Sequence, residues 1–418
     1  MPSVDGETLR AWRRSRGWDV PRTAQAIRRA ASEAGQPIAA HDAMIRMIYG
    51  WERGDHKLSE RYELLYAAAL DVTTELLRRG PIRLELAAQS GARRMASGPY
   101  APEVIATIGA AVHNDHDADR EPPAPTVVHA EISRAWELRQ SAQYVHLGDV
   151  LTGLLYDTAT WMGTAPGERQ ASEAATAAVH THDMVSSLLK RLGAYEMAAI
   201  VADRAFRVAR GTSSRLLIGA AQLRVANVYL SASCHTEAVA VAAAAADKLP
   251  PREASPRAEL ATFGALLLTA AVGSAGMGEA AQAWEFLGHA KAALRGDHEH
   301  ADLYAVFGPV NLAVHGVQVA TELGDGREAL RRAERVDESR MPSVLLERRS
   351  TLLIDIARSH RLQQDHTAAA EALLQAERVA PLEVRYNATA RSLLGELLTV
   401  TPASAGLREM ASRLGVAA

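Results

Sequence analysis

Residues 327–336 read REALRRAERV, and residues 367–379 read TAAAEALLQAERV. Each stretch follows a short polar turn, and each repeats small or apolar residues at spacings of three and four. This spacing places those residues on one face of an α-helix. The two stretches therefore indicate a helical unit that occurs more than once in the chain.

Five similar turns divide the C-terminal part of the chain, and an Ala-rich amphipathic segment follows each of them. The turns comprise residues 192–195, 233–235, 276–278, 323–326 and 364–366. Small residues near the start of the following segments are Ala198, Ala238, Ala281, Ala329 and Ala369, at spacings of 40, 43, 48 and 40. A repeat of this length with paired helices predicts an α-solenoid, in which alanine allows close helix packing.

The composition favours the same fold class. Alanine, the residue with the highest helix propensity, accounts for 82 of the 418 residues. Aromatic residues make up only 5%, which argues against β-sandwiches and barrels. We therefore predict an all-α protein. The net charge of −3 gives no general basic field, so any nucleic-acid surface must be a local patch.

Several classes of function lack support in the sequence. The single cysteine, Cys234, excludes an intramolecular disulfide and a cysteine-rich zinc site. The phosphate-binding, nucleophile-elbow and zinc-protease motifs are absent from the sequence. We therefore expect no enzymatic activity, no metal and no cofactor. A signal sequence and a convincing membrane span are also lacking, so we expect a cytoplasmic protein without membrane contact.

The first eighty residues differ from the rest in their charge and in the turn and capping residues that separate short helical segments. They carry 13 basic and 11 acidic residues, and they predict short helices. The expected helices cover residues 8–16, 19–33, 40–50, a segment starting at residue 59, and residues 73–79. In the third helix Ile45 and Ile48 should face inward, and in the fourth Leu64, Leu65 and Ala68 should do so.

Two strings carry a family resemblance: residues 9–18 read LRAWRRSRGW, and residues 48–54 read IYGWERG. They resemble the XRE-type helix-turn-helix DNA-binding domain over about the first 75 residues. The resemblance implies that Trp51 fills a small core and that Glu52 pairs with an arginine of the first helix. The stretch between Trp18 and Trp51 is longer than in the compact family pattern.

A recognition helix in this position would read base edges in the major groove. Its candidate outward residues are His41, Asp42, Ala43, Arg46, Tyr49 and Gly50. Arg46 is suited to bidentate contact with guanine, and Asp42 either accepts from a cytosine amino group or caps the helix. Candidate phosphate contacts are Arg13, Arg22, Arg53 and Lys57. Alternatively, these arginines form an ordinary solvated helix face.

Prolines and glycines mark a spacer over residues 96–128, with a short apolar segment at 104–112. We therefore expect a helix-turn-helix domain over 1–80, a linker with a short helix over 81–128, and a helical repeat domain over 129–418. The repeats resemble tetratricopeptide (TPR) repeats in the Gly-Asp turn at residues 324–325, the small residues after each turn, and Pro381 after the last helix. Together the two parts resemble actinobacterial XRE regulators with a TPR-like domain.

This resemblance implies a transcriptional regulator that binds double-stranded operator DNA as a homodimer and senses a peptide or small-molecule effector. Candidate groove residues for the effector are Asn227, Tyr229, Asn311, His315 and Gln318. The terminal leucines at positions 394, 397, 398, 407 and 414 either pack on their own chain or form the dimer contact. Two alternatives remain: a TPR adaptor whose helix-turn-helix domain contacts proteins, and a regulator whose solenoid is only a dimerisation scaffold.

Overall fold

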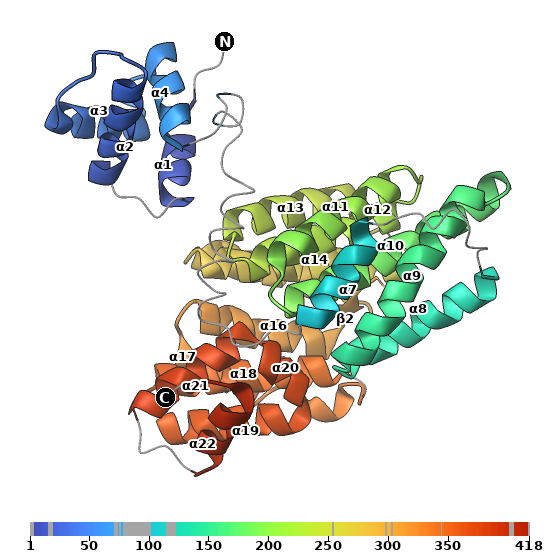
Figure 1. Cartoon of the computed structure of the whole chain (residues 1–418). Coiled ribbons are helices and arrows are strands. Elements are labelled where there is room, and N and C mark those ends of the chain that lie inside the picture. The colour runs from blue at the N-terminus through green and yellow to red at the C-terminus, as the bar shows by residue number, and fades with distance from the viewer. Residues whose placement is uncertain are drawn as a thin grey trace. The chain divides into compact units, whose positions relative to one another are not determined.

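The structure is a computed structural model of the chain. It describes residues 4–15, 20–70, 74, 77, 102–113, 123–252, 255–296, 299–301, 304–343, 345–400 and 405–416. Within these residues the regular structure is helical, apart from a short antiparallel ribbon of β1 (His300–Ala301) and β2 (Val306–Phe307). The prediction of an all-α protein is therefore confirmed. The chain divides into two compact units, residues 1–92 (unit 1) and 93–418 (unit 2), and Figure 1 shows both.

Unit 1 contains the first four expected helices. They are α1 (Gly6–Ser15), α2 (Val20–Glu33), α3 (His41–Arg53) and α4 (Glu60–Leu70). The expected fifth helix lies outside the described residues except for Thr74 and Leu77. At the end of α3, Gly54 takes a left-handed backbone (φ 78°). Its N–H donates to the Trp51 carbonyl at 3.1 Å, which closes the helix as glycine commonly does.

The core of unit 1 forms around two tryptophans. Trp12 is fully buried, and its indole N–H donates to the Leu77 carbonyl at 3.0 Å. Trp51 is 5% exposed, so its predicted burial is confirmed. In α4 the expected inward face is partly wrong, because Leu64 is 55% exposed and Ala68 is also exposed. The face toward the core is carried by Leu65, Tyr66 and Leu70, which offer more apolar surface than Ala68.

Unit 2 is a succession of helices. They are α7 (Pro102–His113), α8 (Pro125–Gln140), α9 (Tyr144–Thr164), α10 (Gly167–Arg191), α11 (Tyr195–Arg210), α12 (Arg215–Ser231), α13 (His235–Lys248), α14 (Arg257–Gly276), α15 (Ala280–Ala292), α16 (Pro309–Glu322), α17 (Gly326–Ala333), α18 (Leu346–Leu362), α19 (His366–Val379), α20 (Pro381–Tyr386), α21 (Ala388–Val400) and α22 (Ala405–Leu414). The expected helix over 104–112 is present as α7, which packs against α9. Residues 78–101 and 114–122 lie outside the described part, so the linker limits stay a prediction.

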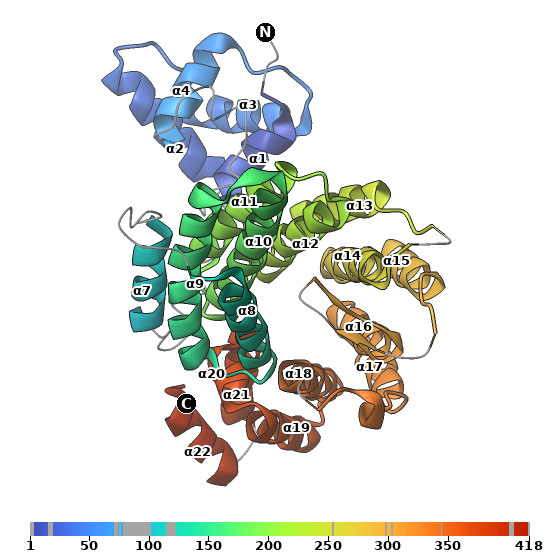
Figure 2. The same cartoon turned by 90° about the vertical axis from the view of Figure 1, so that its right-hand side faces the viewer.

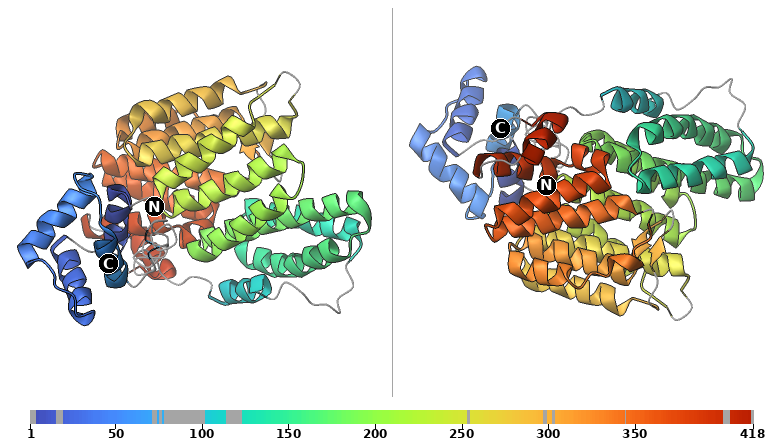
Figure 3. Two further views of the ribbon diagram at one scale, coloured as in Figure 1. Left: turned by 90° about the horizontal axis from the view of Figure 1, so that it is seen from above. Right: turned by 90° about the horizontal axis from the view of Figure 1, so that it is seen from below.

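Six helix pairs form the body of unit 2: α8–α9, α10–α11, α12–α13, α14–α15, α16–α17 and α18–α19. A three-residue turn joins the helices of each pair, and its middle residue is left-handed, with φ between 57° and 82°. These middle residues are Ala142, Gly193, Ser233, Gly278, Gly324 and Gln364. The five expected turns are therefore present, and residues 141–143 add one that was not expected. Figures 2 and 3 show the pairs following one another around an arc.

The small residue after each turn occupies one structural position, the fourth residue of the second helix. Ala198, Ala238, Ala329 and Ala369 are all fully buried there. The third expected residue is wrong, because Ala281 is exposed and Ala283 is the buried one. Two glycines flank Met277, and the second of them, Gly278, is the left-handed residue of the turn. The register of α15 therefore starts two residues later than expected.

Two apolar segments pack inside unit 2. By length and composition alone, α14 could cross a membrane, but 83% of its most apolar window is buried within the unit, as in a core helix. Among the terminal leucines, positions 394, 397, 407 and 414 are buried against α18 and α19 of the same chain, and Leu398 is partly buried there. The own-chain alternative is therefore the one observed for these leucines, of which only Leu398 keeps partial exposure.

The corrected register gives a matched pair of substitutions. Ala283→Leu inserts a larger side chain into a fully buried position, and it should lower the free energy of unfolding of unit 2 by about 1–3 kcal/mol. Ala281→Leu adds the same atoms to an exposed position and should change stability by less than about 0.5 kcal/mol. Urea unfolding followed by circular dichroism measures both. A larger loss in Ala281→Leu than in Ala283→Leu would restore the original register.

Candidate functional site

The third helix of unit 1 carries a polar stripe. Asp42, Arg46, Tyr49 and Arg53 are exposed, and their spacing of four, three and four residues places them along one face of α3. The opposite face carries Met44 and Ile48, which are fully buried, together with Trp51. The helix therefore has one face that builds the core and one that is available to a ligand.

The structure corrects part of the expected outward set. Gly50 is buried, and the His56 ring covers it so closely that a Cβ there would lie 3.1 Å from the ring. His41 and Ala43 are half-buried. Ile45, expected inward, is also only half-buried, because the unbranched side chain of Met44 fills the core instead. The face of α3 is thus rotated slightly from the expected one.

Arg13 has a structural partner. Its Nε and Nη2 atoms donate to the two carboxylate oxygens of Glu52 at 2.6 and 2.8 Å. Arg10 adds a hydrogen bond to the Glu52 carbonyl at 2.8 Å. The hydrogen bond and the charge of Glu52 raise the pKa of Arg13. This bidentate pair ties α1 to α3, and the expected phosphate contact of Arg13 stays a prediction.

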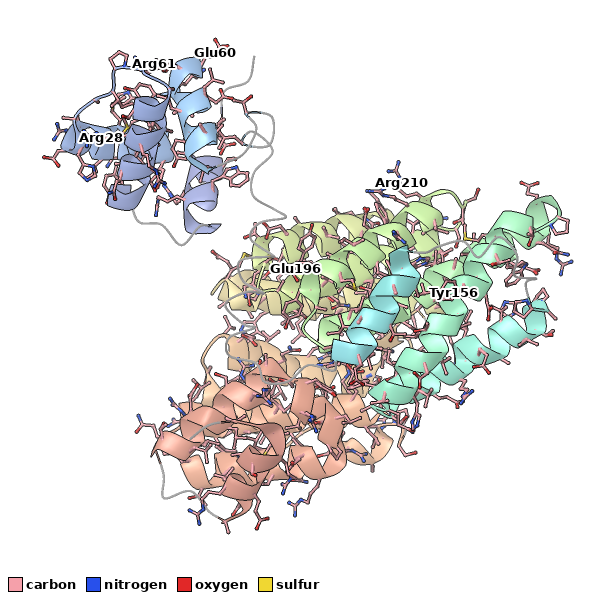
Figure 4. All side chains as sticks on the ribbon, viewed as in Figure 1. Arg28, Glu60, Arg61, Tyr156, Glu196 and Arg210 are labelled. Carbon is pink, nitrogen blue, oxygen red and sulfur yellow. The ribbon has the colours of Figure 1, made fainter. Side chains whose placement is uncertain are left out.

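The other residues expected to contact phosphate, Arg22, Arg53 and Lys57, differ in exposure and ion pairing. Arg53 and Lys57 are exposed, and Arg53 pairs with the exposed Asp55 at 2.9 Å. The side chain of Arg22 lies outside the described part of the chain. Figure 4 shows Arg28 and Arg61 at the surface of unit 1. Arg61 donates to the Pro37 carbonyl, so of these two Arg28 is the freer cation.

Unit 2 encloses a cavity of about 420 Å³, a volume within the usual range of small-molecule sites. The first helices of the six pairs all contribute to its wall: α8, α10, α12, α14, α16 and α18. The second helices reach it only near their starts, through Tyr195 of α11 and His235 of α13. The paired arrangement therefore produces an inner layer of helices that faces a common space.

Four of the five expected groove residues line this cavity: Asn227, Asn311, His315 and Gln318. Tyr229 does not line it. Asn227 and Tyr229 are two residues apart on α12, so their side chains point about 200° apart and cannot face the same space. The sequence therefore located the inner face correctly on α16 and only in part on α12.

Asn311 and His315 of α16 have defined hydrogen bonds, and these fix which of their atoms can accept a further bond. Asn311 is 2% exposed, and its amide nitrogen donates to the Val306 carbonyl at 2.7 Å, while its Oδ1 has no hydrogen-bond partner among the described residues. His315 Nδ1 lies 2.8 Å from the Asn311 carbonyl, so it carries the proton. Burial, with the nearby Arg348, lowers the pKa of His315 to about 3. Its neutral ring thus keeps Nε2 as an acceptor.

The charged groups of the cavity were not expected from the sequence. Six cations line it: Arg139, Lys190, Arg191, Arg224, Arg348 and Arg358. They come from four helices far apart in sequence, so no local motif unites them. One signal was available, because Arg224 is the single charged residue inside the otherwise uncharged stretch 216–232. Charged side chains are rarely placed on such an apolar helix without a partner or a function.

A network of ion pairs and hydrogen bonds joins α8, α9 and α10 to α18 and α20 of unit 2. Arg191 of α10 contacts Glu347 of α18, and it contacts Glu383 of α20 at 2.7 Å. Tyr144 of α9 donates to Glu383 at 2.6 Å, and Arg139 of α8 lies 3.6 Å from Glu347. Burial alone would raise the pKa of Glu347, but the Arg191 and Arg139 guanidiniums hold it well below its ordinary value.

A second ionic cluster lies on the same wall. Arg358 donates to Glu322 at 2.8 Å and to Asp355 at 3.0 Å. Burial raises the pKa of Asp355 to about 6, although Arg358 acts in the opposite direction. Within the described residues no three His, Cys, Asp or Glu side chains are close enough to hold a metal ion. The wall of the cavity is therefore rich in charged and polar side chains.

The role of Arg13 leads to a test with a matched control. Arg13→Met leaves the Glu52 carboxylate, 4% exposed, without its closest partner, and should destabilise unit 1 by about 3–5 kcal/mol. Arg53→Met removes an exposed pair and should cost at most about 1 kcal/mol. Thermal unfolding of the full-length variants by circular dichroism should show an early transition only for Arg13→Met. Equal, small effects in both would mean that Arg13 is not structural.

Two comparisons of this chain with known proteins found no match. No family model matches it, and no curated protein sequence matches it significantly. Its function is therefore inferred from its own residues and contacts.

Proposed function

We propose that the protein is a cytoplasmic transcriptional regulator in which unit 1 binds double-stranded operator DNA. In this proposal α2 and α3 form an XRE-type helix-turn-helix, with α3 as the recognition helix. The observation that carries it is the exposed stripe of Asp42, Arg46, Tyr49 and Arg53 on α3. Such a stripe presents a guanidinium and other polar groups to base edges while the opposite face builds the core.

The contacts beneath α3 support this proposal. Trp51 packs in the core, and Glu52 is held by Arg13 of α1, as the XRE resemblance implies for these two positions. Both residues fix the C-terminal end of α3 to the rest of unit 1. A recognition helix needs such rigid support because base readout depends on a fixed orientation of the whole helix.

We further propose that unit 2 is a TPR-like sensor. Six helix pairs with one common turn and a buried small residue in most second helices support the likeness. The cavity along the inner helices gives an effector a place to bind.

We also propose that the protein is a homodimer, because paired half-sites double the DNA contacts. A mass of twice 44.8 kDa by light scattering would support it, and a monomeric mass would refute it.

One observation favours the adaptor alternative. Leu64 of α4 is 55% exposed and Tyr49 of α3 is 47% exposed. Exposed apolar and aromatic side chains are typical of protein contact surfaces. An adaptor function therefore predicts that unit 1 binds a protein, and that it shows no preference for one DNA sequence over another.

Substitution of Arg46 tests the DNA proposal. After selection of a bound sequence from genomic fragments, Arg46→Ala should weaken specific binding by about 1–3 kcal/mol and relax the preference at one base pair. Arg28→Ala, an exposed arginine of α2, should weaken all sequences alike or have no effect. Gel shifts at matched salt measure both variants.

Two outcomes would contradict the proposal. If no fragment is selected above background at any salt concentration, unit 1 does not read DNA sequence and the adaptor function is favoured. If a sequence is selected but Arg46→Ala leaves its affinity unchanged, α3 is not the recognition helix in this register. A steep salt dependence with no sequence preference would indicate phosphate contacts alone.

A further inference from the structure

The cavity of unit 2 holds more positive charge than its carboxylates neutralise. Glu347 and Glu383 pair with Arg139 and Arg191, and Glu322 and Asp355 pair with Arg358. The remaining cations are Lys190, Arg224 and Arg348. In the described part of the chain none of these three side chains makes a hydrogen bond or an ion pair to another residue.

The three unpaired cations come together from different helices. Lys190 lies on α10, Arg224 on α12 and Arg348 on α18. Each interacts electrostatically with both Arg139 and Glu347, so they surround this one ion pair in the cavity wall. All three side chains are half-buried in this wall. Moving an unpaired cation even partly out of water is unfavourable, so the wall offers a favourable place for an anion.

The electrostatic state of these groups indicates the same deficit of negative charge. Burial lowers the pKa of Arg224 and of Arg348, although the carboxylate of Asp183 acts in the opposite direction at Arg224 and that of Glu347 at Arg348, and the like charge of Arg139 adds to the lowering at both. Burial, with Arg191 and Arg224, lowers the pKa of Lys190 to about 7. A bound anion would raise the pKa of each of these groups, since an opposite charge favours the protonated form.

The rest of the wall supplies groups for the body of a ligand. Asn311 keeps an unpaired Oδ1, and neutral His315 keeps Nε2 as an acceptor. Both groups accept hydrogen bonds, so they suit hydroxyl or amine donors. Tyr304 and Tyr386 add aromatic surface. The cavity thus combines cations for an acidic group with acceptors for a polar body.

We propose that this cavity binds a small polar molecule carrying at least two negative charges, as phosphate or carboxylate groups, through Lys190, Arg224 and Arg348. Planar carboxylates and tetrahedral phosphates both present two neighbouring oxygens, and a guanidinium group can donate one hydrogen bond to each of them. The inference rests on the proposed sensor role of unit 2, and it names the class of effector.

Binding of such an anion should weaken as the pH rises. Lys190 faces Arg191 of its own helix, Arg224 of α12, Arg139 of α8 and Glu347 of α18. Above pH 7 it loses its proton, so anion binding must then take up a proton. Burial also raises the pKa of Asp183, which faces Arg224 and Arg139, to about 7. As the pH rises through 7, ionisation of Asp183 adds negative charge near these cations. Loss of the Lys190 proton and ionisation of Asp183 therefore both weaken anion binding at higher pH.

The test uses the purified full-length protein, without DNA, and two probes. Pyrophosphate represents the phosphate class, and citrate represents the carboxylate class. Calorimetric titrations at pH 6.5 and pH 8.5 are run at equal ionic strength, with chloride as the monovalent reference. We expect at least one probe to bind with a Kd below about 1 mM at pH 6.5 and at least tenfold more weakly at pH 8.5. The tighter probe identifies the class.

Variants assign the binding to the cavity, because unit 1 also carries exposed arginines. Arg224→Met and Lys190→Met should each weaken binding at least tenfold. Neither residue has an ion-pair partner among the described residues, so both variants should fold, which far-ultraviolet circular dichroism checks. Arg378→Met removes an exposed cation of α19 and should leave binding unchanged. Lys190→Met should also flatten the dependence on pH.

Three results would overturn the inference: neither probe binds more tightly than chloride, binding is equal in Arg224→Met and Arg378→Met, or affinity does not fall between pH 6.5 and 8.5. Because no DNA is present, each of these leaves the proposed DNA binding of unit 1 intact. Conversely, failure of the gel shifts would leave anion binding by unit 2 standing.

Discussion

The guanidinium of Arg191 is the contact on which the shape of unit 2 depends. It bridges Glu347 of α18 and Glu383 of α20 from its position at the end of α10. Most helices in this unit contact mainly their neighbours in sequence, and such a stack by itself is an open array. The Arg191 bridge, together with Tyr144 and Arg139, joins the beginning of the array to its end.

This closure explains why the inner helices face one common cavity. When α18 is held against α8, the first helices of all six pairs point toward a common centre. The same contact concentrates charge there, because Glu347 can neutralise only part of the cationic wall. Glu383 is fully buried, so removal of its partner would leave an isolated charge in the interior, which is strongly unfavourable. Stability and ligand chemistry therefore depend on the same side chains.

The sequence predicted local features well and long-range ones poorly. Helical periodicity and turn residues located the five turns and placed Asn311, His315 and Gln318 on the inner face, since each depends on a few adjacent residues. It misplaced Ala281 because either of two glycines could form the turn. It missed Arg191 and Glu347 as partners, since they lie 156 residues apart and meet only through the curvature of the stack. In unit 1, Met44 replaced Ile45 in the core because burial depends on the packing of all the helices.

A double-mutant cycle between Arg191 and Glu347 tests the closure most directly. Urea unfolding of Arg191→Met, Glu347→Gln and the double variant gives the interaction energy of the pair, free of the effects of each residue alone. If the pair closes the array, the double variant should be more stable than the sum of the single effects predicts, by about 2–3 kcal/mol. Additive effects, within about 0.5 kcal/mol, would show that α10 and α18 are not joined through this contact.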